Sequence, residues 1–175
     1  MNSGPQEAHR LLASACGLIS IADSSVAGAG ERAFVGPRTH SLFFLFAQVA
    51  ELALKAFLVK KGVSLHLLAK PKPYGHNLRA LLTEARTNHG FNAPELPAVF
   101  FDPWNDLYAR GKRLQYFVSD GGPLPPVKAT REMLTGFIAE AATEGPATQS
   151  DVGMTIDFGA NYKGLSLGEA RALHP

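Results

Sequence analysis

Ser41–Val59, SLFFLFAQVAELALKAFLV, is apolar along most of its length. It is long enough to cross a membrane as a helix. Gln48, Glu51 and Lys55 lie in its middle, however, and an ionised side chain there costs about 2.5–3.5 kcal/mol on insertion scales. Steps of three and four residues place all three on one helical stripe. The sequence therefore predicts a nearly buried helix with one polar stripe, in a cytoplasmic protein with no membrane partner.

Further segments repeat apolar side chains at the steps of a helix. Asn77 can cap one of them, and Asp102 followed by Pro103 is typical of a fresh helix start. Gly62 and Gly90 are natural residues for helix ends. The helices that we expect cover about residues 4–26, 39–61, 78–88, 103–111 and 127–143, with a short helical turn at 95–101. The predicted fold class is all-α, an up-and-down bundle of about five helices.

Composition and charge divide the chain into a body and a tail. The chain has 175 residues, of which 46% are hydrophobic and 18% charged, enough to build one compact core. Residues 38–113 hold eleven basic and five acidic side chains, a net charge of +6, whereas residues 140–175 hold two and five, a net charge of −3. We expect a helical domain over 1–145 and an extended, acidic, glycine-rich tail over 146–175.

No residue pattern indicates a metal or cofactor. The six histidines include no pair three or four residues apart on one helix, and Cys16 is the only cysteine. Cys16 lies in an apolar stretch, as a buried and inert thiol does. We therefore expect no metal site and no cofactor.

Two groups of residues are candidates for ligand binding. Glu51 and Lys55 have the spacing of an ion pair on one helix, and the stripe that they form is either a structural polar seam or the wall of a functional groove. The segment YARGKRLQYF interleaves basic and aromatic side chains, a composition suited to phosphate contact and base stacking. Its alternative role is a solvated helix end. The residues concerned are Tyr108, Arg110, Lys112, Arg113 and Tyr116.

A third candidate is the segment GHNLR, in which His76 and Arg79 stand at the start of a predicted helix. Backbone N–H groups and a nearby cation at a helix start can bind an anion. A plain helix cap at Asn77 is the simpler interpretation.

The order of three segments resembles the HEPN domain family, small helical bundles often encoded beside minimal nucleotidyltransferases. The segments are AQVAELALKAFLVKKG at 47–62, YGHNLRALL at 74–82 and LYARGKRLQYF at 107–117. Glu51, Lys55, His76 and Leu78 match the family pattern, and Asn77 stands where an Asp is common. The resemblance covers about residues 7–145. It implies a homodimer through the first two long helices, a nucleotidyltransferase-like partner protein, and a toxin–antitoxin or phage-defence setting.

Many members of that family are metal-independent ribonucleases that use an Arg followed, after four to six residues, by a His. No arginine in this chain has such a His, the nearest being Arg32 with His40. The expectation is a catalytically silent HEPN-like protein that binds RNA, a nucleotide or a partner protein. Its expected ligand-binding residues are Glu51, Lys55, His76, Arg79, Tyr108, Arg110, Arg113 and Tyr116. The alternatives are a divergent ribonuclease in which His76 meets Arg110 or Arg113 in space, and a purely structural scaffold.

Overall fold

The computed structural model describes residues 4–29, 37–109 and 124–143, and in these ranges the protein is helical with no strand. The all-α prediction is therefore confirmed. The predicted tail at 146–175 lies outside the described residues, and so does most of the loop between the first two helices. The helices are α1 (Gly4–Ala29), α2 (Pro37–Lys60), α3 (Leu65–Leu68), α4 (Leu78–His89), α5 (Ala98–Ala109) and α6 (Val127–Thr143).

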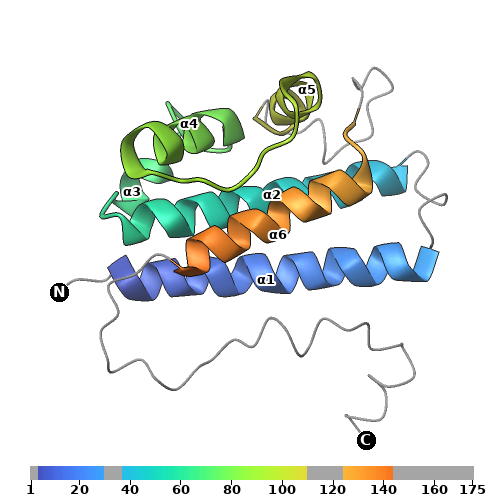
Figure 1. Cartoon of the computed structure of the whole chain (residues 1–175), viewed down its shortest axis with the longest axis horizontal. Coiled ribbons are helices and arrows are strands. Elements are labelled where there is room, and N and C mark those ends of the chain that lie inside the picture. Colours follow the sequence, from blue (N-terminus) through green and yellow to red (C-terminus); the bar gives the residue numbers. More distant parts are fainter. Residues whose placement is uncertain (1–3, 30–36, 110–123, 144–175) are drawn as a thin grey trace, which may run out of the picture. The chain divides into compact units, whose positions relative to one another are not determined.

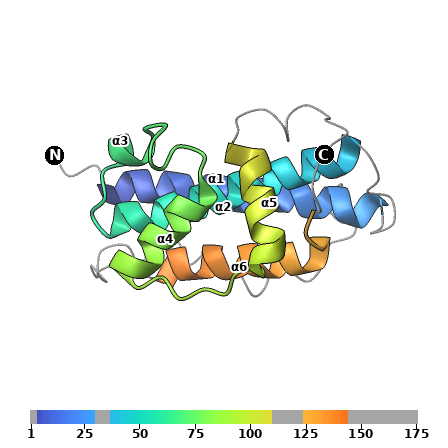
Figure 2. The ribbon, with the colours of Figure 1, turned by 90° about the horizontal axis from the view of Figure 1, so that it is seen from above.

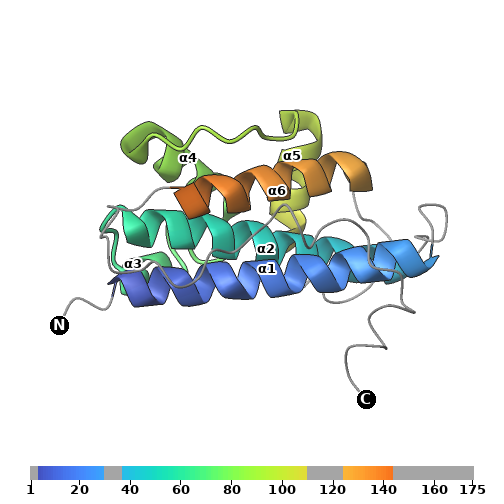
Figure 3. The same ribbon diagram turned by 60° about the horizontal axis from the view of Figure 1, so that its bottom comes forward.

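The helix that contains the apolar stretch, α2, lies at the centre of the bundle and packs against each of the other five described helices. The long helices α1 and α6 run beside it, α1 antiparallel and α6 parallel to it (Figures 1 and 3). On another side of α2, α4 and α5 cross it at steep angles, as Figure 2 shows from above. By length and composition α2 could also cross a membrane, and 78% of that apolar window is buried inside the bundle.

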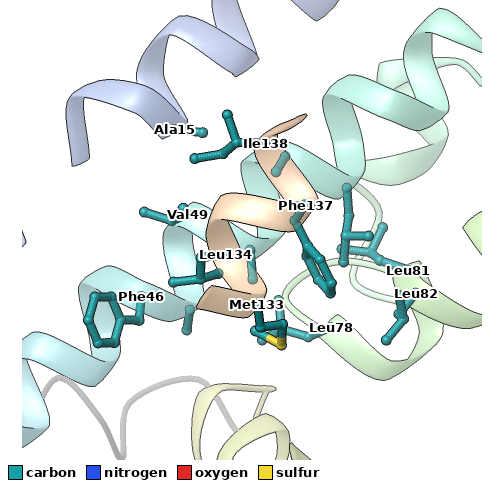
Figure 4. Packing of buried hydrophobic residues seen from close by; sticks show 14 of the residues in the cluster. Ala15, Phe46, Val49, Leu78, Leu81, Leu82, Met133, Leu134, Phe137 and Ile138 are labelled. Carbon is teal, nitrogen blue, oxygen red and sulfur yellow. The ribbon is translucent and has the colours of Figure 1, made fainter. Parts of the chain in front are cut away.

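The core forms where the apolar stripes of these helices meet. Phe137 of α6 lies between α2 and α4, and its ring makes an edge-to-face contact with Phe91, at 5.1 Å between centroids. Figure 4 shows how side chains from α1, α2, α4 and α6 converge there. Edge-to-face pairs add about 0.5–1.5 kcal/mol to the area that they bury. The labelled members of this cluster are Ala15, Phe46, Val49, Leu78, Leu81, Leu82, Met133, Leu134, Phe137 and Ile138.

The predicted break before Pro103 is wrong, because α5 continues through it from Ala98 to Ala109. A proline in a helix interior removes one backbone hydrogen bond. Here tertiary packing outweighs that loss: Phe101 and Trp104, on either side of Pro103, are both fully buried, and their rings meet edge to face at 5.8 Å. The Trp104 indole N–H also donates to the Phe43 carbonyl of α2 at 3.2 Å.

Most of the predicted helix ends are confirmed. The Asn77 side chain accepts from the Ala80 N–H and caps α4, and Gly90 ends that helix in the left-handed region with φ +74°. Gly62, with φ +90°, follows the last turn of α2. The one-turn helix α3 was not expected, because four residues are too few to show a period.

Lys60 lies in the last turn of α2, where its positive charge complements the helix dipole. Its Nζ also donates to the carbonyls of Ala141 and Ala142, at 2.6 and 3.3 Å, at the end of α6. It can do so because α2 and α6 run parallel and end side by side.

Candidate functional site

The candidate site is built around the Glu51 carboxylate, which lies in the middle of α2 with only 10% of its side chain exposed. Its Oε1 accepts from Lys55 Nζ at 2.6 Å. Its Oε2 accepts from the Tyr108 hydroxyl at 2.6 Å and lies 2.9 Å from His76 Nδ1. The carboxylate therefore joins α2 to α5 and to the segment between α3 and α4. We call Glu51, Lys55, His76 and Tyr108 the Glu51 cluster.

The partners of Glu51 keep it ionised. Burial alone raises the pKa of a carboxyl group, but here hydrogen bonds from Lys55 and Tyr108, the charge of Lys55 and the contact with His76 outweigh burial. The pKa of Glu51 is consequently lowered. An ionised carboxylate can only accept hydrogen bonds, so each of the three partners is the donor.

The Tyr108 hydroxyl keeps its proton and therefore remains a hydrogen-bond donor. Burial raises the pKa of Tyr108, and the negative charge of Glu51 raises it further, well above its ordinary value. The Tyr108 ring lies close to two others: the His76 imidazole at 5.6 Å and the Phe44 ring at 5.9 Å between centroids. Phe44 is partly buried and stands seven residues before Glu51, on the same stripe of α2.

In contrast to the rest of the cluster, the His76 side chain is 66% exposed. Two neighbouring residues position it. Gly75 has φ +43°, and a Cβ there would lie 3.1 Å from backbone atoms of Pro71, so only glycine allows the chain to turn so tightly. Asn77, on the other side, is fixed as the cap of α4. The imidazole is thus presented to solvent from a well-defined backbone, with one ring nitrogen tied to Glu51.

Arg79, which the sequence places in the ligand-binding set, points to other partners in the structure. Its guanidinium donates to Asp102 at 2.8 and 2.5 Å and to Glu95 at 3.4 Å. The group also lies 4.4 Å from the centre of the Phe101 ring. These contacts hold α4 against α5, and the guanidinium of Arg79 is occupied by them.

The start of α4 is capped, and three of its first backbone N–H groups have protein acceptors. Asn77 Oδ1 takes the Ala80 N–H at 3.1 Å. The buried Asn105 of α5 takes the Arg79 N–H at 3.0 Å. The Leu81 N–H donates to the Asn77 carbonyl at 3.1 Å. The cap interpretation of GHNLR is therefore confirmed, and these groups are already used within the fold.

Of the eight residues in the expected binding set, four meet in the Glu51 cluster. Arg110, Arg113 and Tyr116 lie outside the described residues, beginning two positions beyond Tyr108 in the sequence. Sequence reasoning missed Phe44 and Asn105. The seven-residue spacing from Glu51 could have revealed Phe44, whereas nothing in the sequence indicates that Asn105 meets the start of α4.

The arrangement has the parts of a positioned imidazole: a buried acceptor on one nitrogen and solvent around the rest of the ring. Such a group can accept or donate a hydrogen bond to a bound ligand, or transfer a proton. The described residues hold no group of three or more His, Cys, Asp or Glu side chains placed to bind a metal ion.

No protein-family model, no curated protein and no solved structure matches the chain.

Proposed function

We propose that the chain is a HEPN-like, catalytically silent helical protein that binds RNA or a nucleotide at a surface centred on His76. The observation that carries the proposal is the hydrogen bond of the buried Glu51 carboxylate to the exposed His76 imidazole, at 2.9 Å. A toxin–antitoxin or phage-defence setting, with a nucleotidyltransferase-like partner protein, belongs to the same proposal through the family resemblance.

A purely structural role explains the Glu51 cluster poorly. Removing two charges from water costs several kcal/mol per ion, and apolar side chains of similar volume often stabilise a core as well or better. Glu51 and Lys55 nevertheless lie in the long, largely apolar helix α2, where they are 8% and 7% exposed. What the polar groups add is a fixed position for His76 and Tyr108 at the edge of the core. A binding surface uses such preorganisation.

The chemistry around His76 suits a nucleic acid. The imidazole offers one hydrogen-bonding nitrogen, and the partly buried Phe44 ring, 5.9 Å from the ring of the buried Tyr108, offers aromatic surface nearby. Phosphate binding requires cations. The first charged residues after Tyr108 in the sequence are basic: Arg110, Lys112 and Arg113. A surface of this composition favours a single-stranded, phosphate-bearing ligand.

A binding titration tests this proposal. Fluorescence anisotropy with a labelled single-stranded RNA should give a log affinity that falls linearly with log salt concentration. His76→Ala should weaken binding about threefold to tenfold, the effect of one hydrogen bond. His66→Ala is the matched control, since His66 is an exposed histidine on α3 outside the cluster. A flat salt response, or equal losses in both variants, would overturn the proposal.

The same hydrogen bond favours a second candidate function, metal-independent RNA cleavage. A carboxylate that orients one imidazole nitrogen is a common way to position a general acid or base. Incubating labelled RNA with wild type, His76→Ala and Arg113→Ala in EDTA separates the two functions. Intact RNA in every sample supports the silent protein. Cleavage by wild type that is lost in both variants would replace it with a ribonuclease.

The proposed homodimer through α1 and α2 has a separate test. Light scattering coupled to gel filtration should give twice the chain mass at micromolar concentration. A monomer mass there would remove the dimer from the proposal without affecting ligand binding.

A further inference from the structure

The ring nitrogen of His76 that faces away from Glu51 is the part of the Glu51 cluster still open to a ligand. His76 Nδ1 lies 2.9 Å from Glu51 Oε2, and the imidazole has its second nitrogen, Nε2, on the far side of the ring. Among the described residues no hydrogen bond to Nε2 is present, and the side chain is 66% exposed. This nitrogen is therefore available to whatever binds here.

The chemistry of Glu51 determines what Nε2 offers. Glu51 Oε1 lies 2.6 Å from the Lys55 ammonium, and Oε2 accepts from the Tyr108 hydroxyl, so the carboxylate is an acceptor on both oxygens. The hydrogen of the bond between His76 Nδ1 and Glu51 Oε2 must therefore be on Nδ1. A neutral imidazole carries a single proton, and with that proton on Nδ1 its Nε2 has a lone pair and no hydrogen. Neutral His76 is then a hydrogen-bond acceptor toward solvent.

Because Nε2 of neutral His76 is an acceptor, the ligand group that it binds must be a hydrogen-bond donor. A phosphate oxygen also carries only lone pairs and cannot donate to Nε2, whereas the ribose 2′-hydroxyl is a donor and is the group that distinguishes RNA from DNA. On this basis, and resting on the proposed RNA-binding function, we infer that Glu51 is a positioning residue: it fixes the Nδ1–H form of His76, so that Nε2 accepts a hydrogen bond from a 2′-hydroxyl of the bound RNA.

The first test measures the positioning without any ligand. Nitrogen-15 NMR of the full chain at pH 8, above the range in which imidazole ordinarily titrates, distinguishes a ring protonated on Nδ1 from one protonated on Nε2. We expect the Nδ1–H form for His76. The exposed His66, outside the cluster, should show the mixture of forms that solvent gives. A predominantly Nε2–H form of His76 would overturn the inference.

The second test measures the selection. The probes are a single-stranded oligouridylate of about ten nucleotides and the same oligomer with 2′-fluoro sugars, which keeps the phosphates and removes the donor. Wild type at pH 8 should prefer the hydroxyl form by about threefold to tenfold. His76→Ala should lose that preference, and His66→Ala should keep it.

The outcomes separate the two proposals. Salt-dependent binding of both oligomers with equal affinity would overturn the hydroxyl contact and leave the RNA-binding function in place. If neither oligomer binds, that function is overturned, and this inference with it, whichever form NMR shows. A preference that survives in His76→Ala would assign the hydroxyl contact to another residue and contradict the role given to His76.

Discussion

Glu51 accepts hydrogen bonds from three side chains while it is almost fully buried. Each donor comes from a different part of the chain: Lys55 from the next turn of α2, His76 from the segment before α4, and Tyr108 from α5. The three together lower its pKa against the opposing effect of burial. The exposed imidazole therefore depends on a network whose other members lie beneath the surface.

The Tyr108 hydroxyl should contribute more to the free energy of unfolding than an equivalent hydroxyl near the surface. Tyr108→Phe removes the donor 2.6 Å from Glu51 and leaves a buried carboxylate oxygen short of a partner. We expect a loss of about 1.5–3 kcal/mol in the free energy of unfolding, measured by urea denaturation. Tyr74→Phe is the control, because it removes the same atom beside the more exposed Glu84. Equal losses in the two variants would contradict this description of the cluster.

Glu51 also makes a prediction about pH. Its pKa in the folded protein lies below the ordinary value of 4.5, so its ionised form stabilises the fold above that pH. The contribution is lost as the pH falls through the lower, folded-state pKa. Glu51→Gln, which leaves the Lys55 ammonium buried without its partner, should cost about 3–5 kcal/mol at pH 7. The difference in unfolding free energy between wild type and variant should shrink as the pH is lowered toward 3.

Glu84→Gln provides the comparison for that experiment. The pKa of Glu84 is also lowered, chiefly by its hydrogen bond from Asn88, but its side chain is 22% exposed. Its substitution should cost less than about 1 kcal/mol at pH 7. A Glu51→Gln loss no larger than this, or one that stays constant with pH, would show that Glu51 is not the buried ionised acceptor described above.

At the scale of the elements, the segment between α3 and α4 decides where His76 lies. Gly62 and Gly75 both have positive φ, but a Cβ at Gly62 meets nothing within 4 Å, whereas one at Gly75 meets the Pro71 backbone at 3.1 Å. Gly62→Ala should lower the free energy of unfolding by about 1 kcal/mol, because alanine is strained in the left-handed region. Gly75→Ala should lower it by about 2–3 kcal/mol, because its Cβ would also meet the backbone.

The two glycine variants should differ in function as well. Because Gly75 precedes His76 directly, its substitution should weaken RNA binding by about as much as His76→Ala, once protein that remains folded at low temperature is compared. Gly62→Ala should bind like wild type. Thermal unfolding and the anisotropy titration check the two properties separately. Unchanged binding in Gly75→Ala would show that the tight turn does not position the imidazole.

Local sequence patterns are enough to predict part of this site. The four-residue step from Glu51 to Lys55, within an apolar helix, indicates a partly buried ion pair, and the structure confirms it. His76 and Tyr108 stand 25 and 57 residues from Glu51, and no periodicity links them to it. Only the packing of α5 and of the segment before α4 against α2 brings them together.

Two errors at the element scale have physical causes. Proline rules end a helix before Pro103, yet the burial of Trp104 and its neighbours keeps α5 continuous. Arg79 stands beside His76 in the sequence, but α4 turns its side chain toward Asp102 and Glu95 of other segments. In both cases contacts between distant residues outweigh a local preference, and single-sequence reasoning cannot evaluate such contacts.

At the scale of the whole molecule, the proposed ligand surface occupies one place on a helical body. The described helices pack around α2, and α2 itself carries the buried charges on which the surface depends. In the proposed function, the net positive charge of residues 38–113 attracts phosphates over a distance, whereas His76 acts only in contact. Salt should therefore alter overall affinity, and substitution of His76 should alter the contact itself.

Binding at His76 is measured most directly by following the imidazole signals in carbon–proton NMR spectra of the full chain during titration with single-stranded RNA. We expect the His76 signal to move in step with binding and to saturate with it, while the signals of the exposed His9 and His66 stay in place. A His76 signal that stays unchanged while the RNA binds would contradict binding at His76.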